Sequence, residues 1–157
     1  MSDEPAPRPM ANMLNAANGG QITVQMTPEE FIYLDRDCDQ FKTVIGQIQR
    51  LADEISRTDH WGLGEANDEL HSARAMVGRY KVKARGAPDG NGVYEIMAQH
   101  IQIVEDIQNV YRIMRDQMMQ ADSEWAAAYN SLSATLPERP PVGPTPGPHI
   151  LPDGSTR

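Results

Sequence analysis

Apolar residues along most of this chain recur at alternating spacings of three and four, the pattern of an α-helix that buries one side against another helix. The first such stretch has eight positions: Phe31, Leu34, Cys38, Phe41, Ile45, Ile48, Ala52 and Ile55. Just before it, Thr27 is a suitable N-cap, Pro28 suits the first helical position and Glu30 completes a capping box. The sequence therefore predicts a long helix that begins directly after Thr27.

Two more stretches follow the same pattern. The second has seven positions and closes at Gly86: Leu63, Ala66, Leu70, Ala73, Val77, Tyr80 and Ala84. Residues 86–92 contain four glycines or prolines together with Asp89 and Asn91, which predicts a loop. The third stretch begins at Val93 and predicts one helix over residues 93–134, roughly 63 Å long at 1.5 Å per residue.

The third predicted helix is longer than its neighbours, so one end must overhang or bend. Its last turns carry Trp125, Tyr129 and Leu132, and Trp and Tyr often anchor interfaces. Three alternatives exist for what covers this apolar end: another chain, the C-terminal tail, or residues 10–26 folded back over it.

Ten of the twelve prolines lie within residues 1–9 or 137–157 and so delimit the helical part. The sequence predicts a flexible N-terminal segment at 1–26, a helical domain at 27–134 and a disordered, Pro/Gly-rich tail at 135–157. The predicted fold class is all-α. Short connections favour an elongated antiparallel helical hairpin or a three-helix bundle.

Composition excludes several classes of protein. A net charge of −8 argues against nucleic-acid binding, and a single cysteine permits no internal disulfide. No apolar run approaches the roughly 18 residues that membrane insertion requires. The acidic, proline-rich N-terminus does not resemble a cleavable signal peptide.

We find no residues that predict catalysis. No serine elbow or phosphate-binding loop occurs, and Cys38 falls on the first seam, where a small buried hydrophobe is the default. Asp68 and His71 come closest to the Glu-x-x-His step of carboxylate metal centres, but no second such step exists. We therefore expect no catalytic residue, no metal and no cofactor; a helical enzyme or metal protein is the least favoured class.

A basic cluster lies at the end of the second helical stretch: Arg79, Lys81, Lys83 and Arg85. It has two interpretations. The cations either bind an acidic or phosphate-bearing ligand, or they solvate the helix end and neutralise acids of the same domain. The second interpretation is favoured.

A turn between the first two helical stretches carries a family resemblance. Its sequence is His60-Trp61-Gly62-Leu63-Gly64, and the turn motif consists of Trp61, Gly62 and Gly64. Over about residues 22–133 the chain resembles the WXG-type helical-hairpin proteins that type VII secretion systems export in actinobacteria and related Gram-positives. Glycine allows the chain to reverse, and the indole can cover the end of the helical core with its N–H toward solvent or a backbone carbonyl.

A second likeness lies near the end of the third helical stretch. Met118, Asp122 and Trp125 have the spacing of the family's export motif, with Met118 at the position of its tyrosine. Together with Tyr129 they are the candidate export or recognition surface.

The resemblance implies a non-enzymatic, secretion-associated protein that acts through helix–helix contacts as substrate, co-substrate or helper. It implies a homodimer, or a heterodimer with a related hairpin, and contact with the secretion machinery. It also implies a cytoplasmic location before export and a secreted or cell-surface one afterwards. The alternative is a cytosolic coiled-coil adaptor or structural protein with no export role.

Overall fold

The computed structural model describes residues 8–139, and within this range every regular element is a helix. The helices are α1 (Ala11–Asn18), α2 (Pro28–Arg57), α3 (His71–Ala84), α4 (Val93–Ala121) and α5 (Ser123–Thr135). The prediction of an all-α fold is thereby confirmed for the described range. Predictions that concern residues 1–7 and 140–157 lie outside it.

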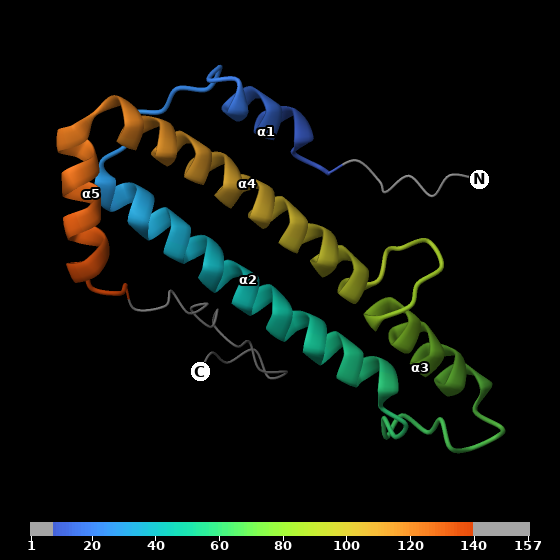
Figure 1. The fold of residues 1–157 in the computed structure, drawn as a ribbon. Helices are drawn as coiled ribbons and strands as arrows, with labels where there is room; N and C mark the ends of the chain where they lie inside the picture. The colour runs from blue at the N-terminus through green and yellow to red at the C-terminus, as the bar shows by residue number, and fades with distance from the viewer. Residues whose placement is uncertain (1–7, 140–157) are drawn as a thin grey trace, which may run out of the picture.

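The two longest helices, α2 and α4, run side by side in opposite directions (Figure 1). Helix α3 packs mainly against the C-terminal part of α2 and meets α4 only near their junction, so α3 and α4 follow one another along α2 (Figure 1). Helix α1 lies along the other side of α4, and α5 crosses the end where α2 begins. The second and third helical stretches are therefore arranged end to end rather than side by side.

The start of α2 agrees with the sequence pattern. The backbone N–H of Glu30 donates to Thr27 Oγ1 at 3.3 Å, and the backbone N–H of Thr27 donates to Glu30 Oε2 at 2.7 Å. Pro28 takes the first helical position. The predicted capping box is confirmed.

Helix α3 begins at His71, eight residues after the start of the apolar pattern at Leu63. Gly62 and Gly64 adopt positive φ angles of 71° and 88°, which no right-handed helix accommodates. Residues 58–70 therefore form a connection rather than the first turns of a helix.

The long third stretch breaks into α4 and α5 at Asp122. The Asp122 carboxylate accepts hydrogen bonds from the backbone N–H groups of Glu124 and Trp125, at 2.9 and 3.0 Å. Asp122 is thus the N-cap of a new helix, and the prediction of one continuous helix over residues 93–134 is wrong at this point.

Residues 11–18 form helix α1, although the sequence assigns residues 1–26 to a flexible segment. Asp106 on α4 is completely buried beneath this segment, 3.2 Å from Arg8, and its Oδ1 accepts no hydrogen bond. The backbone N–H of Met10 lies 3.4 Å from Asp106 Oδ2, and Gln117 donates to the carbonyl of Ala17 at 2.9 Å. Contacts with α4 therefore hold a helix too short to be stable alone.

Candidate interaction surface

The predicted turn motif closes the connection between α2 and α3. Trp61 is half-buried, its ring stacks on Tyr80 with centroids 5.8 Å apart, and its Nε1 donates to the carbonyl of Thr58 at 2.9 Å. Of the two indole partners that the sequence allows, the structure has the backbone carbonyl. Trp61 thereby packs the turn against α3.

Glu65, which the sequence analysis does not single out, organises this turn. Its carboxylate accepts backbone hydrogen bonds from Trp61 at 2.5 Å, Leu63 at 2.9 Å and Gly62 at 3.2 Å. These bonds lower the pKa of Glu65 to about 2, and the bond from Trp61 has the largest effect. An acid directly after a Gly-x-Gly turn is the signal that identifies it.

The low pKa of Glu65 predicts acid-sensitive order in the turn. Because the folded pKa lies below the ordinary 4.5, the carboxylate's contribution is complete above about pH 4.5 and is lost as the pH falls through about 2. A carboxyl-carbon NMR titration, assigned with Glu65→Gln, should give a midpoint near 2. A midpoint near 4.5 would show that the three hydrogen bonds do not form.

Gly64 is expected to accommodate a side chain poorly. Its φ is +88°, and an added Cβ would lie 2.8 Å from Leu70 Cδ1. Gly64→Ala should lower the free energy of unfolding by about 1–2 kcal/mol, the cost of left-handed backbone in an L-residue. The control is Gly46→Ala in the middle of α2, where no atom lies within 4 Å of the added Cβ. There the substitution should raise the free energy of unfolding, measured in urea, by up to about 1 kcal/mol.

The structure gives each member of the candidate recognition surface a packing or capping position. Trp125 packs edge-to-face on Phe31 with centroids 5.6 Å apart, and Tyr129 stacks on Trp125 at 5.6 Å. Met118 contacts the same apolar cluster, and Asp122 caps α5. None of these four residues is fully buried, and Asp122 is exposed.

The apolar end of the third helical stretch is covered by the chain's own N-terminal segment. Four half-buried residues of this segment pack against the cluster of Ala17, Phe31, Val110 and Met114; they are Leu14, Ile22, Val24 and Met26. The indole Nε1 of Trp125 also donates to the carbonyl of Met26 at 3.4 Å. Of the three alternative covers, residues 10–26 account for the packing within the described range.

The contact between α2 and α4 is partly polar. Gln108, only 2% exposed, accepts from Lys42 Nζ at 2.7 Å and donates to Asp35 Oδ1 at 3.1 Å and Asp39 Oδ1 at 3.0 Å. Arg112 forms a two-pronged ion pair with Asp35 at 2.5 and 3.0 Å. The pKa of Asp39 is lowered, and the largest cause is the hydrogen bond that its side chain accepts from Lys42. A polar cluster around the buried Gln108 side chain thus lies between two helices for which the sequence predicts apolar packing.

The predicted seam on α2 is consequently split between two sides of the helix. Phe31, Ile45 and Ala52 are buried in the fold. Four other apolar residues are exposed at spacings of three, four and three: Phe41 (65%), Val44 (51%), Ile48 (38%) and Leu51 (56%). We call these four residues the α2 stripe. Phe41 and Ile48 belong to the seam that the sequence predicts to be buried, whereas Val44 and Leu51 lie outside that pattern.

An apolar groove of about 430 Å³ continues the α2 stripe toward the start of the helix. Its lining comes from α2, from α4 and from the chain after α5: Glu30, Tyr33, Leu34, Asp37, Cys38, Phe41, Val104, Ile107 and Arg139. Burial raises the pKa of the Cys38 thiol, and the negative charge of Asp35 adds to this effect. The thiol is therefore protonated near neutral pH and is a poor nucleophile.

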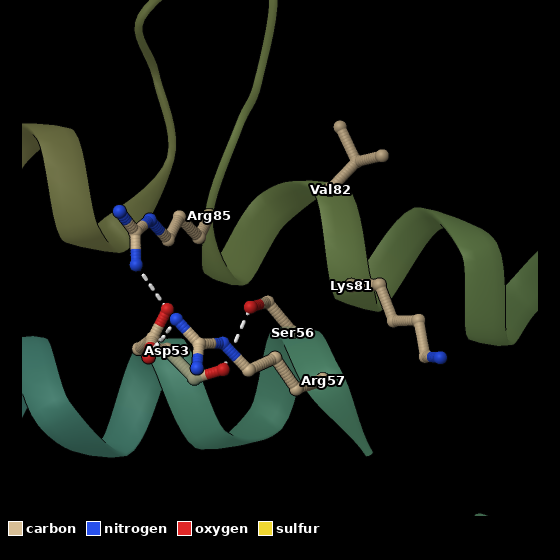
Figure 2. Close-up of a pocket in the computed structure, with 6 residues that line it drawn as sticks. All are labelled: Asp53, Ser56, Arg57, Lys81, Val82 and Arg85. Carbon is tan, nitrogen blue, oxygen red and sulfur yellow. Dashed lines mark hydrogen bonds and ion pairs between the residues drawn. The ribbon is translucent and has the colours of Figure 1, made fainter. Parts of the chain in front are cut away.

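The basic cluster lies beside another hollow, between α2 and the end of α3. Figure 2 shows Arg57 and Arg85 reaching the carboxylate of Asp53 from opposite sides. Lys81 pairs with Asp59 at 3.3 Å. Three of the four predicted cluster cations have carboxylate partners, since Lys83 lies 3.8 Å from Asp89. This pairing supports charge neutralisation within the domain over an anionic ligand.

The described residues contain no group of three or more His, Cys, Asp or Glu side chains that could hold a metal ion. Asp68, one half of the closest metal pattern, pairs instead with Arg74 at 3.1 Å. In the range 8–139 no helix combines the length and apolarity needed to cross a bilayer.

The α2 stripe and its adjoining groove therefore form the candidate interaction surface. Compared with protein-family models, curated proteins and solved structures, the chain matches none of them.

Proposed function

We propose that this protein is a non-enzymatic helix–helix interaction protein whose partner binds the α2 stripe. The observation that carries the proposal is the exposure of Phe41, Val44, Ile48 and Leu51 along one side of one helix. Contiguous exposed apolar patches on soluble domains commonly mark interaction sites. Burying such side chains contributes roughly 25 cal/mol per Å² of apolar area removed from water.

The spacing of the stripe indicates a helical partner. Side chains at alternating intervals of three and four fit between those of a second helix with the same repeat. Gln40 and Gln47 flank the stripe and carry no charge, so the partner is selected by apolar shape rather than ion pairing. A second copy of the chain or a related helical hairpin meets this requirement. In this proposal α2 is one arm of such a hairpin, and α3 with α4 is the other.

The resemblance to WXG-type proteins extends the proposal to type VII secretion. The Trp61 turn, the helical architecture and the acidic composition support a substrate, co-substrate or helper of an actinobacterial system. The protein would associate in the cytoplasm and reach the cell surface or medium by export. An adaptor that stays in the cytosol is the alternative, and the export experiment below separates the two.

The association test compares Phe41→Ala and Leu51→Ala with Thr43→Ala, which alters an exposed residue on another side of α2. Light scattering across a concentration series tests a second copy, and co-purification tests a small hairpin encoded nearby. Each stripe variant should weaken association by about 30-fold or more, as interface anchors do, and Thr43→Ala should leave it unchanged. Equal affinities for all three variants would refute the stripe as the interface.

The export test must separate recognition from capping at Asp122. Serine is also a good N-cap, so Asp122→Ser should keep α5 intact while it removes the carboxylate. If export depends on this carboxylate, the variant should remain folded in the cells and disappear from the culture filtrate. Normal export of Asp122→Ser would limit Asp122 to capping. Absence of the unaltered protein from the filtrate, with an intact secretion ATPase, would favour the adaptor.

A further inference from the structure

The groove at the start of the α2 stripe lies where the described chain leaves the helical domain. Helix α5 ends at Thr135, and the next residues return to α2. The Arg36 guanidinium donates to the carbonyls of Leu136 at 3.0 Å and Pro137 at 3.2 Å. These two bonds hold residues 136 and 137 against α2.

Arg139, the last described residue, contacts the stripe's own side of α2. Its guanidinium carbon lies 3.8 Å from the centroid of the Tyr33 ring, and its Nη1 lies 3.9 Å from Asp37 Oδ2. Tyr33 and Asp37 precede Phe41 by eight and four residues, so all three share one side of the helix. Arg139 is itself part of the groove lining. The described chain therefore ends at the groove.

We propose that residues 140–157 of the chain bind this groove and continue along the α2 stripe. Residues 140–152 contain six prolines and no Asp, Glu, Lys or Arg, and their large apolar side chains are Val142, Ile150 and Leu151. Proline-rich segments favour the polyproline II conformation, which binds grooves lined by aromatic residues at a low entropic cost. Tyr33 and Phe41 are the aromatic residues of this groove.

The length of the C-terminal segment matches the distance that it must span along α2. Tyr33 and Phe41 are about 12 Å apart along α2 at 1.5 Å per residue, a distance that four polyproline II residues of about 3.1 Å span. On the same scale Leu51 lies about 27 Å from Tyr33, within the reach of Ile150 and Leu151. Because residue 139 is already held in place, the tail meets the groove at a local concentration on the order of millimolar.

This inference does not depend on the identity of an external partner. A docked tail shields part of the α2 stripe in the free protein, and a helical partner that needs the whole stripe must displace it. The tail would then act as an intramolecular competitor, weakening association until a partner of higher affinity is present. Failure of tail docking would leave the helix–helix proposal intact, since that proposal depends on the stripe alone.

Cys38 provides a direct test because it lies in the groove and is the chain's single cysteine. In the full chain, Gly143→Cys places a second thiol next to the groove, and the control Ser155→Cys places one near the chain end. Copper phenanthroline then oxidises each variant at micromolar protein concentration. Docking predicts that Cys38 forms an intramolecular disulfide with the thiol introduced at position 143. Because the shorter tether by itself favours position 143 over position 155, docking is measured by how far Phe41→Ala slows the disulfide at position 143, whose rate should not depend on protein concentration.

Three outcomes decide the proposal. A fast disulfide at position 143 that slows when Phe41→Ala is added supports docking in the groove. A position 143 rate that is unchanged by Phe41→Ala indicates random encounters of a tethered tail and overturns it. Predominant dimers linked through Cys38 of two molecules, whose formation rises with concentration, would overturn it too, because a second copy would then occupy the groove.

Discussion

Phe31→Ala is expected to lower the free energy of unfolding by about 3–5 kcal/mol, whereas Phe41→Ala should change it by less than about 0.5 kcal/mol. These are the only two phenylalanines in the chain, and both lie on α2, ten residues apart. Phe31 is 3% exposed and Phe41 is 65% exposed. The pair therefore tests the same substitution in two environments of one helix.

The large effect at Phe31 follows from its contacts. Its ring packs edge-to-face against Trp125 at 5.6 Å and Tyr111 at 6.2 Å, beside buried Val110 and Met114. Alanine would remove the aromatic pairs and leave a cavity between α2, α4 and α5 that rigid neighbours fill only in part. At Phe41 most of the ring already contacts water, so little burial is lost.

Urea unfolding followed by far-UV circular dichroism measures both variants. The two-site comparison is matched because each variant removes the same side-chain atoms from the same helix. A loss at Phe41 comparable to that at Phe31 would contradict the exposed stripe, since it would mean that residues 8–139 themselves bury Phe41. The association of Phe41→Ala, measured as described above, should be weakened although the free energy of unfolding hardly changes.

Gln108→Ala is expected to cost about 2–3 kcal/mol of unfolding free energy, the second largest effect that we predict. The side chain is almost completely buried and hydrogen-bonds Lys42, Asp35 and Asp39 of α2. Its removal leaves a small cavity and takes the buried partner away from these groups. Because Asp39 is exposed and Lys42 is only partly buried, water can replace some of the lost bonds, which keeps the effect below that of Phe31→Ala.

Two controls separate packing from hydrogen bonding. Gln102→Ala changes an exposed glutamine six residues earlier on the same helix and should have an effect within about 0.5 kcal/mol. Gln108→Leu restores most of the volume without the polar atoms, so it should fall between the native protein and Gln108→Ala. Equal unfolding free energies for Gln102→Ala and Gln108→Ala would refute a structural role for this polar cluster.

The segments between the helices show which features can be predicted from short-range interactions. The cap of α2 at Thr27 and the loop at 86–92 are predictable because they depend on hydrogen bonds and backbone angles within a few residues. The N-cap at Asp122 is equally local, but it is missed from the sequence alone, because the apolar pattern continues across it and predicts one helix over residues 93–134. Helix α1 is not local, because it depends on α4 residues such as Asp106 and Gln117, about 100 positions away.

By itself the sequence determined the fold class of the described chain and the helix ends next to Thr27, Gly86 and Gly92, since these depend on periodicity and short-range capping. Only the tertiary structure decided which side of α2 faces α4. Two adjacent sides of that helix compete for burial, and the choice depends on Gln108 and Arg112, 66 and 77 positions from their partners Lys42 and Asp35. Because these polar contacts lie between the helices, Phe41 and its neighbours are exposed, and a surface for a partner exists.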